Sequence, residues 1–347
     1  MFLTIAIPTY NRADKLAATL NRLLENNLDN VIVTVVDNAS TDHTPAIIRQ
    51  YLGSPLGGKM KYVRNSENIG MLGNIMRCFE QVTTEWLWIL GDDDQPVPEA
   101  ASHIEGAIQA NPKAIYLNFV TTILDIRVSR KTSFVTSGLS QFIAYLDCFS
   151  NLVFISSGVY RVDAFSGYVE MAYSFNHTMV SFLALIFSKL HESPSSMCVF
   201  SNQRIVNCTL TTPSWSYERY CNHAFLIVAL LPTPELRKLF FDKMNSIDPF
   251  APSFTLRSLH QAFLARENVS ANYFYRYANI SSLIGAYNRP LVISYLCSHL
   301  LPKSPFRQLL NGLVASSKQP IPWLGCHINR LLDLELGVPR PRGHKVS

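Results

Sequence analysis

The sequence lacks the features of a membrane-spanning or exported protein. No apolar stretch approaches the roughly 18 residues that a membrane-spanning helix needs, and the run from Ala224 to Leu231 ends at Pro232. The chain also begins without a basic leader or a small-residue cleavage site, and passes from Phe2 directly into a strand pattern. We therefore expect a cytoplasmic protein.

Motifs for zinc, redox chemistry and two common kinds of nucleotide site are also missing. The seven cysteines are an odd number without a close pair, which predicts buried, reduced thiols. The segment from Pro8 to Arg12, after the first predicted strand, contains no glycine and cannot form the Gly-x-Gly-x-x-Gly turn of a nicotinamide-binding fold. A phosphate-binding Walker loop is absent as well. The sequence therefore excludes the usual dinucleotide-binding and P-loop classes.

Composition indicates a folded protein with an uneven charge. The chain has 347 residues, of which 48% are hydrophobic, enough for a sizeable core in one or two domains. From Thr233 to the end there are 14 Lys and Arg against 6 Asp and Glu. This basic, aromatic region fits an anionic membrane surface, or else it is a helical region with ordinary surface charges. No recognition motif accompanies the basic residues, so we expect no nucleic acid partner.

Strand and helix patterns alternate in the first part of the chain. Buried strands are predicted at Thr4–Ile7, Val31–Val36, Lys61–Arg64 and Trp86–Leu90, with helical spacing of apolar residues between them. This order predicts an α/β fold with a mostly parallel sheet and helices on both faces. A later strand is expected at Leu152–Arg161, a hairpin or loop at 121–136, and only helices beyond about residue 217.

Three adjacent aspartates follow the fourth of these strands. Asp92, Asp93 and Asp94 follow Gly91. Neighbouring negative charges at the end of a buried strand need a compensating positive charge, which is usually a divalent cation bound by the carboxylate oxygens. The alternative is a solvated turn that caps the next helix. Asp37 and Tyr10 follow two other strands, and carboxyl ends of parallel strands share the edge where ligands bind.

Four motifs in order resemble the family 2 glycosyltransferases of the GT-A fold. They are Ile5 to Arg12, Val36 to Thr44, Asn65 to Gly70, and Leu90 to Asp94 with Pro98 beyond it. The resemblance covers about the first 210 residues and implies a GT-A domain at 1–212, followed by a helical, basic region at 213–347 for acceptor or membrane association. The subgroup that it most resembles contains bacterial abequosyl- and rhamnosyltransferases of surface polysaccharide synthesis.

The resemblance implies an inverting enzyme that moves a sugar from a nucleotide-diphosphate donor to a glycan or polyprenyl-linked glycan. Such enzymes work in O-antigen or capsule synthesis at the inner face of the cytoplasmic membrane. It also implies Mg²⁺ or Mn²⁺, held at Asp93 with Asp94 beside it, although Gly91 replaces the first Asp of the family's Asp-x-Asp motif. Donor-binding residues carried over from the family are Pro8, Thr9, Tyr10, Arg12, Asp37, Asn68, Gly70, Asn74 and Asp92.

The catalytic base is the least regular part of the resemblance. Relatives place an Asp at the start of the helix after the strand that ends in Tyr160-Arg161, whereas this chain has Ser174 to Thr178 there. His177 is therefore the candidate base, since a neutral imidazole accepts a proton near pH 7, and Glu170 is the second candidate. Gly73 also stands where many relatives carry Arg. These departures leave an alternative, a catalytically inactive module of the same fold that binds a nucleotide sugar or glycan.

Overall fold

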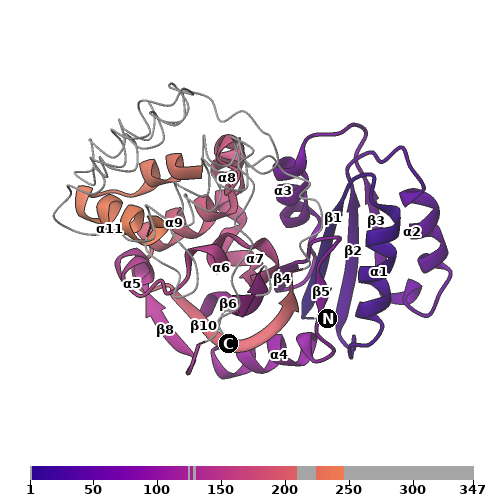
Figure 1. Ribbon diagram of the computed structural model, residues 1–347, viewed down its shortest axis with the longest axis horizontal. Coiled ribbons are helices and arrows are strands. Elements are labelled where there is room, and N and C mark those ends of the chain that lie inside the picture. Colours follow the sequence, from indigo (N-terminus) through magenta and orange to yellow (C-terminus); the bar gives the residue numbers. More distant parts are fainter. Residues whose placement is uncertain (1, 124–125, 128–129, 209–223, 246–347) are drawn as a thin grey trace, which may run out of the picture. The chain divides into compact units, whose positions relative to one another are not determined.

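The computed structural model describes residues 2–123, 126–127, 130–208 and 224–245 (Figure 1). The chain divides into two compact units, Met1–Tyr273 and Phe274–Ser347, and all described residues belong to the first. The predicted boundary at residue 212 falls in 209–223, outside the described residues, and most of the predicted helical region 213–347 also lies outside them. Within the described part, no helix has the length and apolar character that a membrane span requires.

The first four long strands form a parallel sheet, as the sequence predicts. β1 (Leu3–Thr9) lies between β2 (Val31–Asp37) and β4 (Trp86–Ile89), and β3 (Met60–Arg64) pairs with β2. The connections are helical: α1 (Ala13–Leu23), α2 (Thr44–Leu52) with the short turn η1 (Gly57–Lys59), and α3 (Met71–Gln81). Figure 1 shows α1 and α2 on one side of these strands and α3 on the other.

The second half of the sheet is mixed. The strand order is β3-β2-β1-β4-β9-β6-β10-β5, with β7 (Ile126–Arg127) on β6 and β8 (Phe134–Ser137) on β10. β9 (Gly158–Arg161) runs antiparallel to both β4 and β6 (Ala114–Ile123), whereas β10 (Met197–Asn207) is parallel to β6. β5 (Gln95–Pro96) pairs with the end of β10. The expectation of a mostly parallel sheet therefore holds for β1 to β4, and β9 breaks it.

The expected strand at Leu152–Arg161 is wrong in its first half. Residues 149–157 instead form α6 (Phe149–Val153) and a 3-10 turn, η2 (Ile155–Ser157), and only β9 is a strand. The apolar run Leu152 to Ile155 is typical of a strand, but it precedes Ser156 and Ser157, whose side chains are fully buried. Buried hydroxyl groups need hydrogen-bond partners, and in this turn Ser156 Oγ reaches Asp94 while Ser157 Oγ reaches the carbonyl of Phe154.

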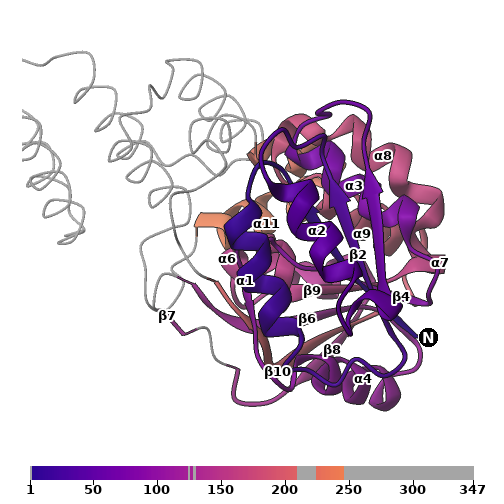
Figure 2. The same ribbon diagram turned by 90° about the vertical axis from the view of Figure 1, so that its right-hand side faces the viewer.

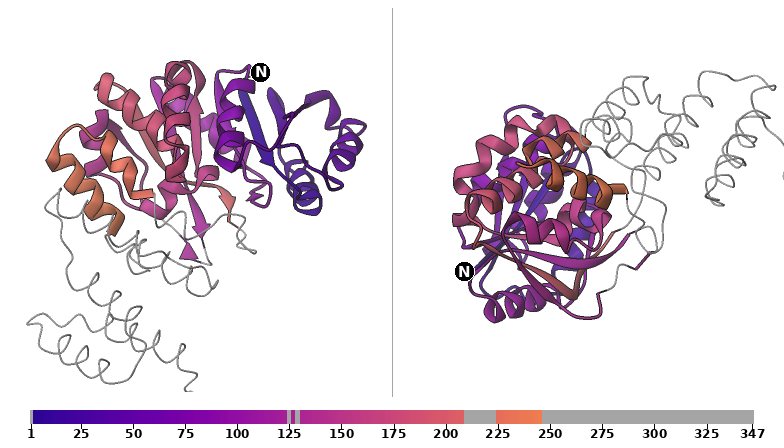
Figure 3. Two further views of the ribbon diagram at one scale, coloured as in Figure 1. Left: turned by 90° about the horizontal axis from the view of Figure 1, so that it is seen from above. Right: turned by 90° about the vertical axis from the view of Figure 1, so that its left-hand side faces the viewer.

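Helices cover the second half of the sheet. They are α4 (Ala100–Ala110), α5 (Gly138–Ala144), α7 (Val162–Phe165), η3 (Ser166–Tyr168), α8 (Val169–Ser174), η4 (Asn176–Thr178) and α9 (Phe182–Glu192). After η5 (Ala224–Leu230), α11 (Pro234–Asn245) returns to this layer. There Phe240 packs edge-on against Phe187 and Phe149, with ring centroids 5.1 and 5.6 Å apart. Figures 2 and 3 show α1 and α2 beside the amino-terminal strands and α11 beside the later helices.

The carboxyl ends of the parallel strands form one edge of the sheet, which we call the rim. Thr9, Asp37 and Arg64, the last residues of β1, β2 and β3, are in register with one another. The end of β10 reaches the same edge, because Asn207 pairs with Gln95 just after the aspartates. The strands beneath are mainly apolar, with Ile5, Trp86 and Trp88 at most 1% exposed. Polar residues of distant segments therefore meet at the rim above a rigid core.

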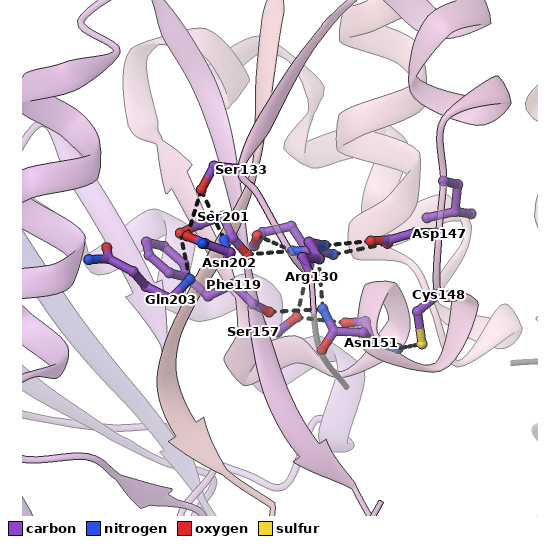
Figure 4. A network of polar contacts seen from close by, with 12 residues as sticks. Phe119, Arg130, Ser133, Asp147, Cys148, Asn151, Ser157, Ser201, Asn202 and Gln203 are labelled. Atoms are coloured by element: carbon purple, nitrogen blue, oxygen red, sulfur yellow. Dashed lines mark hydrogen bonds and ion pairs between the residues drawn. The ribbon is translucent and has the colours of Figure 1, made fainter. Parts of the chain in front are cut away.

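A buried guanidinium stabilises the sheet where the pairing of β6 and β10 is interrupted (Figure 4). The register shifts between Phe200 and Arg204, and Arg130 fills the gap. Its Nη1 donates to the carbonyls of Asn118 (2.7 Å) and Ser201 (2.9 Å), and its Nε contacts Asp147 Oδ2 at 2.6 Å. Arg130 thus replaces ladder hydrogen bonds that the bulged strands cannot make.

Candidate functional site

The acidic turn, Gly91 to Asp94, follows β4 at the rim. Asp92 is 5% exposed, and both of its carboxylate oxygens are bound. Thr9 Oγ1 donates to Oδ2 at 2.7 Å, and Arg12 Nη1 donates to Oδ1 at 2.8 Å. Burial raises the pKa of Asp92, while Arg12 and Thr9 act in the opposite direction. Residues at the end of β1 and the start of α1 therefore hold this carboxylate. The structure thus brings together Thr9, Arg12 and Asp92, three of the predicted donor-binding residues.

Asp93 is the most accessible of the three aspartates. Its side chain is 27% exposed, and its Oδ2 lies 2.7 Å from Arg12 Nη1 and 3.5 Å from Lys15 Nζ. The same Arg12 nitrogen contacts Asp92, so one cationic atom bridges two carboxylates. Two positive side chains at the start of α1 therefore lie against the most accessible carboxylate of the turn.

Asp94 points away from this pair, into the protein. It is 5% exposed, and Ser156 Oγ donates to its Oδ2 at 2.6 Å. Burial raises the pKa of Asp94 to about 7, because an ionised carboxylate is poorly solvated there. The predicted metal pair Asp93 and Asp94 is thus split between two faces of the turn, and the geometry favours a supporting role for Asp94.

The position of Asp94 explains why residue 91 is glycine. A Cβ atom at Gly91 would lie 2.5 Å from Asp94 Oδ2 and 3.1 Å from its Cγ. An aspartate at position 91, as in the family's motif, would need the space that the Asp94 carboxylate fills. The departure from the motif is therefore linked to the inward rotation of Asp94.

We predict that Gly91→Ala destabilises the protein by about 1–3 kcal/mol, the usual cost of forcing an atom into a packed site. The Asp94 carboxylate cannot move aside without losing its bond to Ser156. Gly106→Ala is the matched control, since nothing lies within 4 Å of its added Cβ in the exposed face of α4. Chemical denaturation should show that this second change is stabilising; equal effects of both changes would contradict the account of Gly91.

Thr19 and Lys15 of α1 and Ser156 of η2 belong to the site, although the sequence analysis did not identify them. Thr19 Oγ1 lies 3.0 Å from the carbonyl of Asp92 and 3.1 Å from that of Asp94, on the α1 side of the turn. One signal was present in the sequence: Lys15 and Thr19 are three and seven residues after Arg12, which places them on one helical face. Nothing in the sequence connects Ser156 to the turn.

Asp37 is fully buried at the end of β2. Its Oδ1 accepts the Ser40 N–H at 2.9 Å, and its Oδ2 lies 2.8 Å from Tyr62 OH and 3.2 Å from Arg64 Nε. Burial and the hydrogen bond to Asp37 raise the pKa of Tyr62 to about 12. Arg64 is 44% exposed and covers the carboxylate from the solvent side. A ligand at this end of the rim therefore meets Arg64 before it meets Asp37.

An asparagine cluster joins the end of β2 to the start of α3. Asn38 Nδ2 donates to Asn68 Oδ1 at 2.7 Å, and Asn65 Nδ2 donates to Asn38 Oδ1 and Asn74 Oδ1. Asn74 is buried and donates to the carbonyl of Val36, whereas Asn68 and Gly70 are exposed. Three predicted donor-binding residues lie in this segment. Asn74 holds the loop in place, whereas Asn68 and Gly70 (φ 80°) are the exposed residues of the loop.

The remaining predicted residues lie on both sides of the sheet. Pro8 and Tyr10 flank Thr9, and Tyr10 is 41% exposed. His177 lies in η4, before α9, and Tyr173 OH, four residues before it, contacts Glu80 near the carboxyl end of α3 at 2.6 Å. Tyr168 OH contacts Glu192 at 2.8 Å, at the far end of α9, two residues from Glu170. The roles of His177 and Glu170 both stay predictions.

The residues present fit a divalent ion only in part. Two carboxylate oxygens, Asp92 Oδ1 and Asp93 Oδ2, converge on one cationic atom, so a positive charge is accommodated between them. No group of three His, Cys, Asp or Glu side chains among the described residues is arranged to hold a metal ion. An ion at this position would take its other ligands from the diphosphate of a bound donor and from water.

Comparison with known proteins gives consistent similarities. Residues 4–165 match the model of glycosyl transferase family 2. Abequosyltransferase RfbV of Salmonella typhimurium is 34% identical over 97 residues, which are 27% of this chain and 28% of that protein. An uncharacterized glycosyltransferase of Haemophilus influenzae is 28% identical over 118 residues, 34% of this chain and 37% of that protein. The chain thus aligns with less than two fifths of the length of these curated relatives.

Solved structures of S. aureus TarS (residues 1–349) share the fold. The complex with UDP-GlcNAc superposes with a TM-score of 0.60 at 15% identity and covers 86% of this chain and 88% of TarS. The complex with UDP gives a TM-score of 0.54 at 17% identity, with 84% and 86% covered. These likenesses confirm the predicted GT-A fold, a curled sheet flanked by helices.

Proposed function

Because residues 4–165 match the model of glycosyl transferase family 2, we propose that the protein moves a sugar from a nucleotide-diphosphate donor to an acceptor hydroxyl, with inversion at the anomeric carbon. One observation carries the proposal: at the rim, Arg12 and Lys15 contact Asp93, and the exposed Tyr10 lies two residues before Arg12 in the chain. Such a site offers positive charge for a diphosphate and an aromatic face for a base. TarS, which shares the fold, has been crystallised with UDP and UDP-GlcNAc, in support of a nucleotide-sugar donor.

The base of the donor would bind at the end of β1 and β2. Tyr10 has the exposure to stack on a base, and the backbone of Pro8 and Thr9 lies beside it. Arg64 and the buried Asp37 stand next along the rim and would read the edge of the base. The exposed Asn68 and Gly70 would line the same end, with Asn74 fixing their loop.

The diphosphate would bind at the acidic turn. Arg12 and Lys15 would contact its oxygens, and Asp92 and Asp93 would hold Mg²⁺ or Mn²⁺ against it. The ion, when bound, supplies Lewis-acid stabilisation of the charge that develops on the leaving diphosphate. Negative charge on the diphosphate would draw Arg12 away from the carboxylates that it bridges in the donor-free protein. Asp94 and Thr19 keep the turn in place during this exchange.

The acceptor hydroxyl must lose a proton as the sugar is transferred. His177 is the proposed base: it is exposed, lies in η4 before α9, and stacks on Phe175 with ring centroids 5.9 Å apart. A neutral imidazole at this position takes the proton directly. Replacement of His177 by Gln would then abolish transfer and leave donor binding unchanged.

The acceptor is proposed to be a glycan or a polyprenyl-linked glycan of bacterial surface polysaccharide, O-antigen or capsule. Support comes from the similarity to abequosyltransferase RfbV and from the basic segment after Thr233. We propose that this segment brings the protein to the inner face of the cytoplasmic membrane as a peripheral protein.

Membrane association predicts a salt-dependent partition. The full-length protein should float with vesicles that contain anionic phosphatidylglycerol, and stay unbound with purely zwitterionic vesicles, because about 1 kcal/mol is gained for each basic residue near an anionic surface. Raising the ionic strength to about 0.5 M should release it. Equal flotation with both vesicle types, or none with either, would overturn the proposed location.

A panel of donor sugars tests the activity. Purified protein is incubated with UDP-, GDP-, CDP- and dTDP-sugars and Mn²⁺, and release of the nucleoside diphosphate is measured without acceptor. We expect slow hydrolysis of one donor class, and none with Asp92→Asn. Donor binding without any turnover, with or without acceptor, would favour the inactive binding module, for which Gly91 in the motif is the supporting feature.

A further inference from the structure

The η2 turn carries two adjacent serines whose side chains point in opposite directions. Ser156 and Ser157 are both 0% exposed, and they separate α6 from β9. Ser156 faces the acidic turn, whereas Ser157 faces the interior of the second half of the sheet. The two hydroxyls are therefore equally buried and make different connections.

Ser156 contacts three positions of the segment that contains β4 and the acidic turn. Its Oγ donates to Asp94 Oδ2 at 2.6 Å and accepts the Gly91 N–H at 2.9 Å. Its carbonyl accepts the Trp88 Nε1–H at 2.8 Å. One residue thus fixes the start of the turn, its last side chain and the strand before it.

The other side of the turn is held by α1. Thr19 Oγ1 contacts the carbonyls of Asp92 and Asp94, and the two remaining carboxylates project towards Arg12. Two hydroxyl groups therefore hold the turn from opposite sides. The Thr19 hydroxyl contacts the carbonyls of Asp92 and Asp94, and the Ser156 hydroxyl contacts the Gly91 N–H and the Asp94 carboxylate. A Cβ atom at position 91 would lie 3.5 Å from Ser156 Oγ, so glycine leaves the space beside this contact open.

We propose that Ser156 is a positioning residue for donor binding: it holds the acidic turn in the orientation in which Asp92 and Asp93 face Arg12 and the incoming diphosphate. The proposal rests on the proposed function, since it names the residue that arranges that site. Ser156 itself contacts no ligand; it acts through Gly91 and Asp94. Loss of its hydroxyl would free the turn to relax and would move the two carboxylates that face the donor.

Ser157 belongs to the network of Figure 4 and not to the turn. Its Oγ donates to the carbonyls of Asn151 (2.6 Å) and Phe154 (2.8 Å) and accepts from Asn118 Nδ2 at 3.0 Å. Asn118 Oδ1 in turn accepts from Arg130 Nη2 at 2.6 Å. Ser157→Ala therefore removes a hydroxyl of equal burial, in the same turn, without touching the acidic turn.

The experiment compares Ser156→Ala with Ser157→Ala in the full chain. The probe is whichever of UDP, GDP, CDP and dTDP binds the wild type most tightly with Mn²⁺, measured by calorimetry, and the melting temperature of each variant is measured in parallel. We expect Ser156→Ala to weaken nucleotide binding by about tenfold, the effect of losing a hydrogen bond to a charged group. Ser157→Ala should lower the melting temperature about as much as Ser156→Ala does. Its dissociation constant for the nucleotide should stay within about twofold of the wild-type value.

Three results separate the possibilities. Equal affinities of the two variants would overturn the positioning role, because stability alone would then account for any change. If the wild type binds none of the four nucleotides, the proposed function fails first, and the variants carry no weight. Should Ser156→Ala not fold, Ser156→Cys takes its place, since a thiol leaves no cavity and is only a weak hydrogen-bond partner; wild-type affinity of that variant would equally overturn the proposal.

Discussion

Replacing Asp93 with alanine should lower donor turnover by roughly 100-fold or more, the scale on which a lost electrostatic contact to a developing charge acts. Asp93 is the aspartate whose carboxylate reaches solvent, and Arg12 and Lys15 converge on its Oδ2. Without it, a divalent ion keeps only Asp92, and the two cations lose the partner that orients them. The measurement is the rate of nucleoside diphosphate release from the donor that the wild type accepts.

Asp14→Ala is the control for this prediction. Asp14 is an exposed aspartate in the first turn of α1, between Arg12 and Lys15 in the sequence, so its removal changes the net charge by the same amount. Turnover should stay within about twofold, because exposed charges at a distance are screened by solvent. An Asp93→Ala protein that keeps more than half of the wild-type rate would contradict the role of the acidic turn.

Replacing Arg130 with methionine should cost about 3–5 kcal/mol of unfolding free energy, because it leaves several buried acceptors without a donor, at about 1–3 kcal/mol each. The guanidinium is 2% exposed, and its loss leaves the carbonyls of Asn118 and Ser201 without their donor where β6 and β10 separate. Asp147 is 32% exposed and recovers part of its hydration, so most of the cost arises at the carbonyls. Urea denaturation measures the difference.

Lys131→Met controls for the loss of a positive charge in the same segment. Lys131 is exposed, and only its backbone carbonyl takes part in a described hydrogen bond, with Asn202. A surface change of this kind usually alters stability by less than about 0.5 kcal/mol. A similar small loss for Arg130→Met would show that the interrupted ladder does not depend on the guanidinium.

The amino-terminal half of the fold is predictable because its pattern is local. β1 and β2 are mainly apolar runs that end in a polar residue, Thr9 and Asp37, and helical spacing follows each of them. β9 shows the limit of this reasoning. Its antiparallel direction depends on the turn at Ser156 and Ser157, whose partners lie at residues 91, 94, 118 and 151. Contacts over such separations leave no periodic signal.

The site was predictable where it coincides with a family motif and not where other segments support it. Thr9, Arg12, Asp92 and Asp93 do lie together, as the motifs imply. The inward direction of Asp94 was not predictable, because it depends on the Ser156 hydroxyl and on the space above Gly91. The burial of Asp37 beneath Tyr62 and Arg64 likewise depends on β3, whose pairing with β2 brings these side chains over the carboxylate.

A calorimetric titration of the full-length protein with UDP, GDP, CDP and dTDP, each with and without Mn²⁺, tests the central claim most directly. If the rim is a nucleotide-sugar site, one nucleoside diphosphate should bind, and Mn²⁺ should strengthen its binding by about tenfold or more, since the ion bridges the diphosphate and the carboxylates. Absence of binding for all four nucleotides under both conditions would contradict the claim and leave the acidic turn as a structural element of the fold.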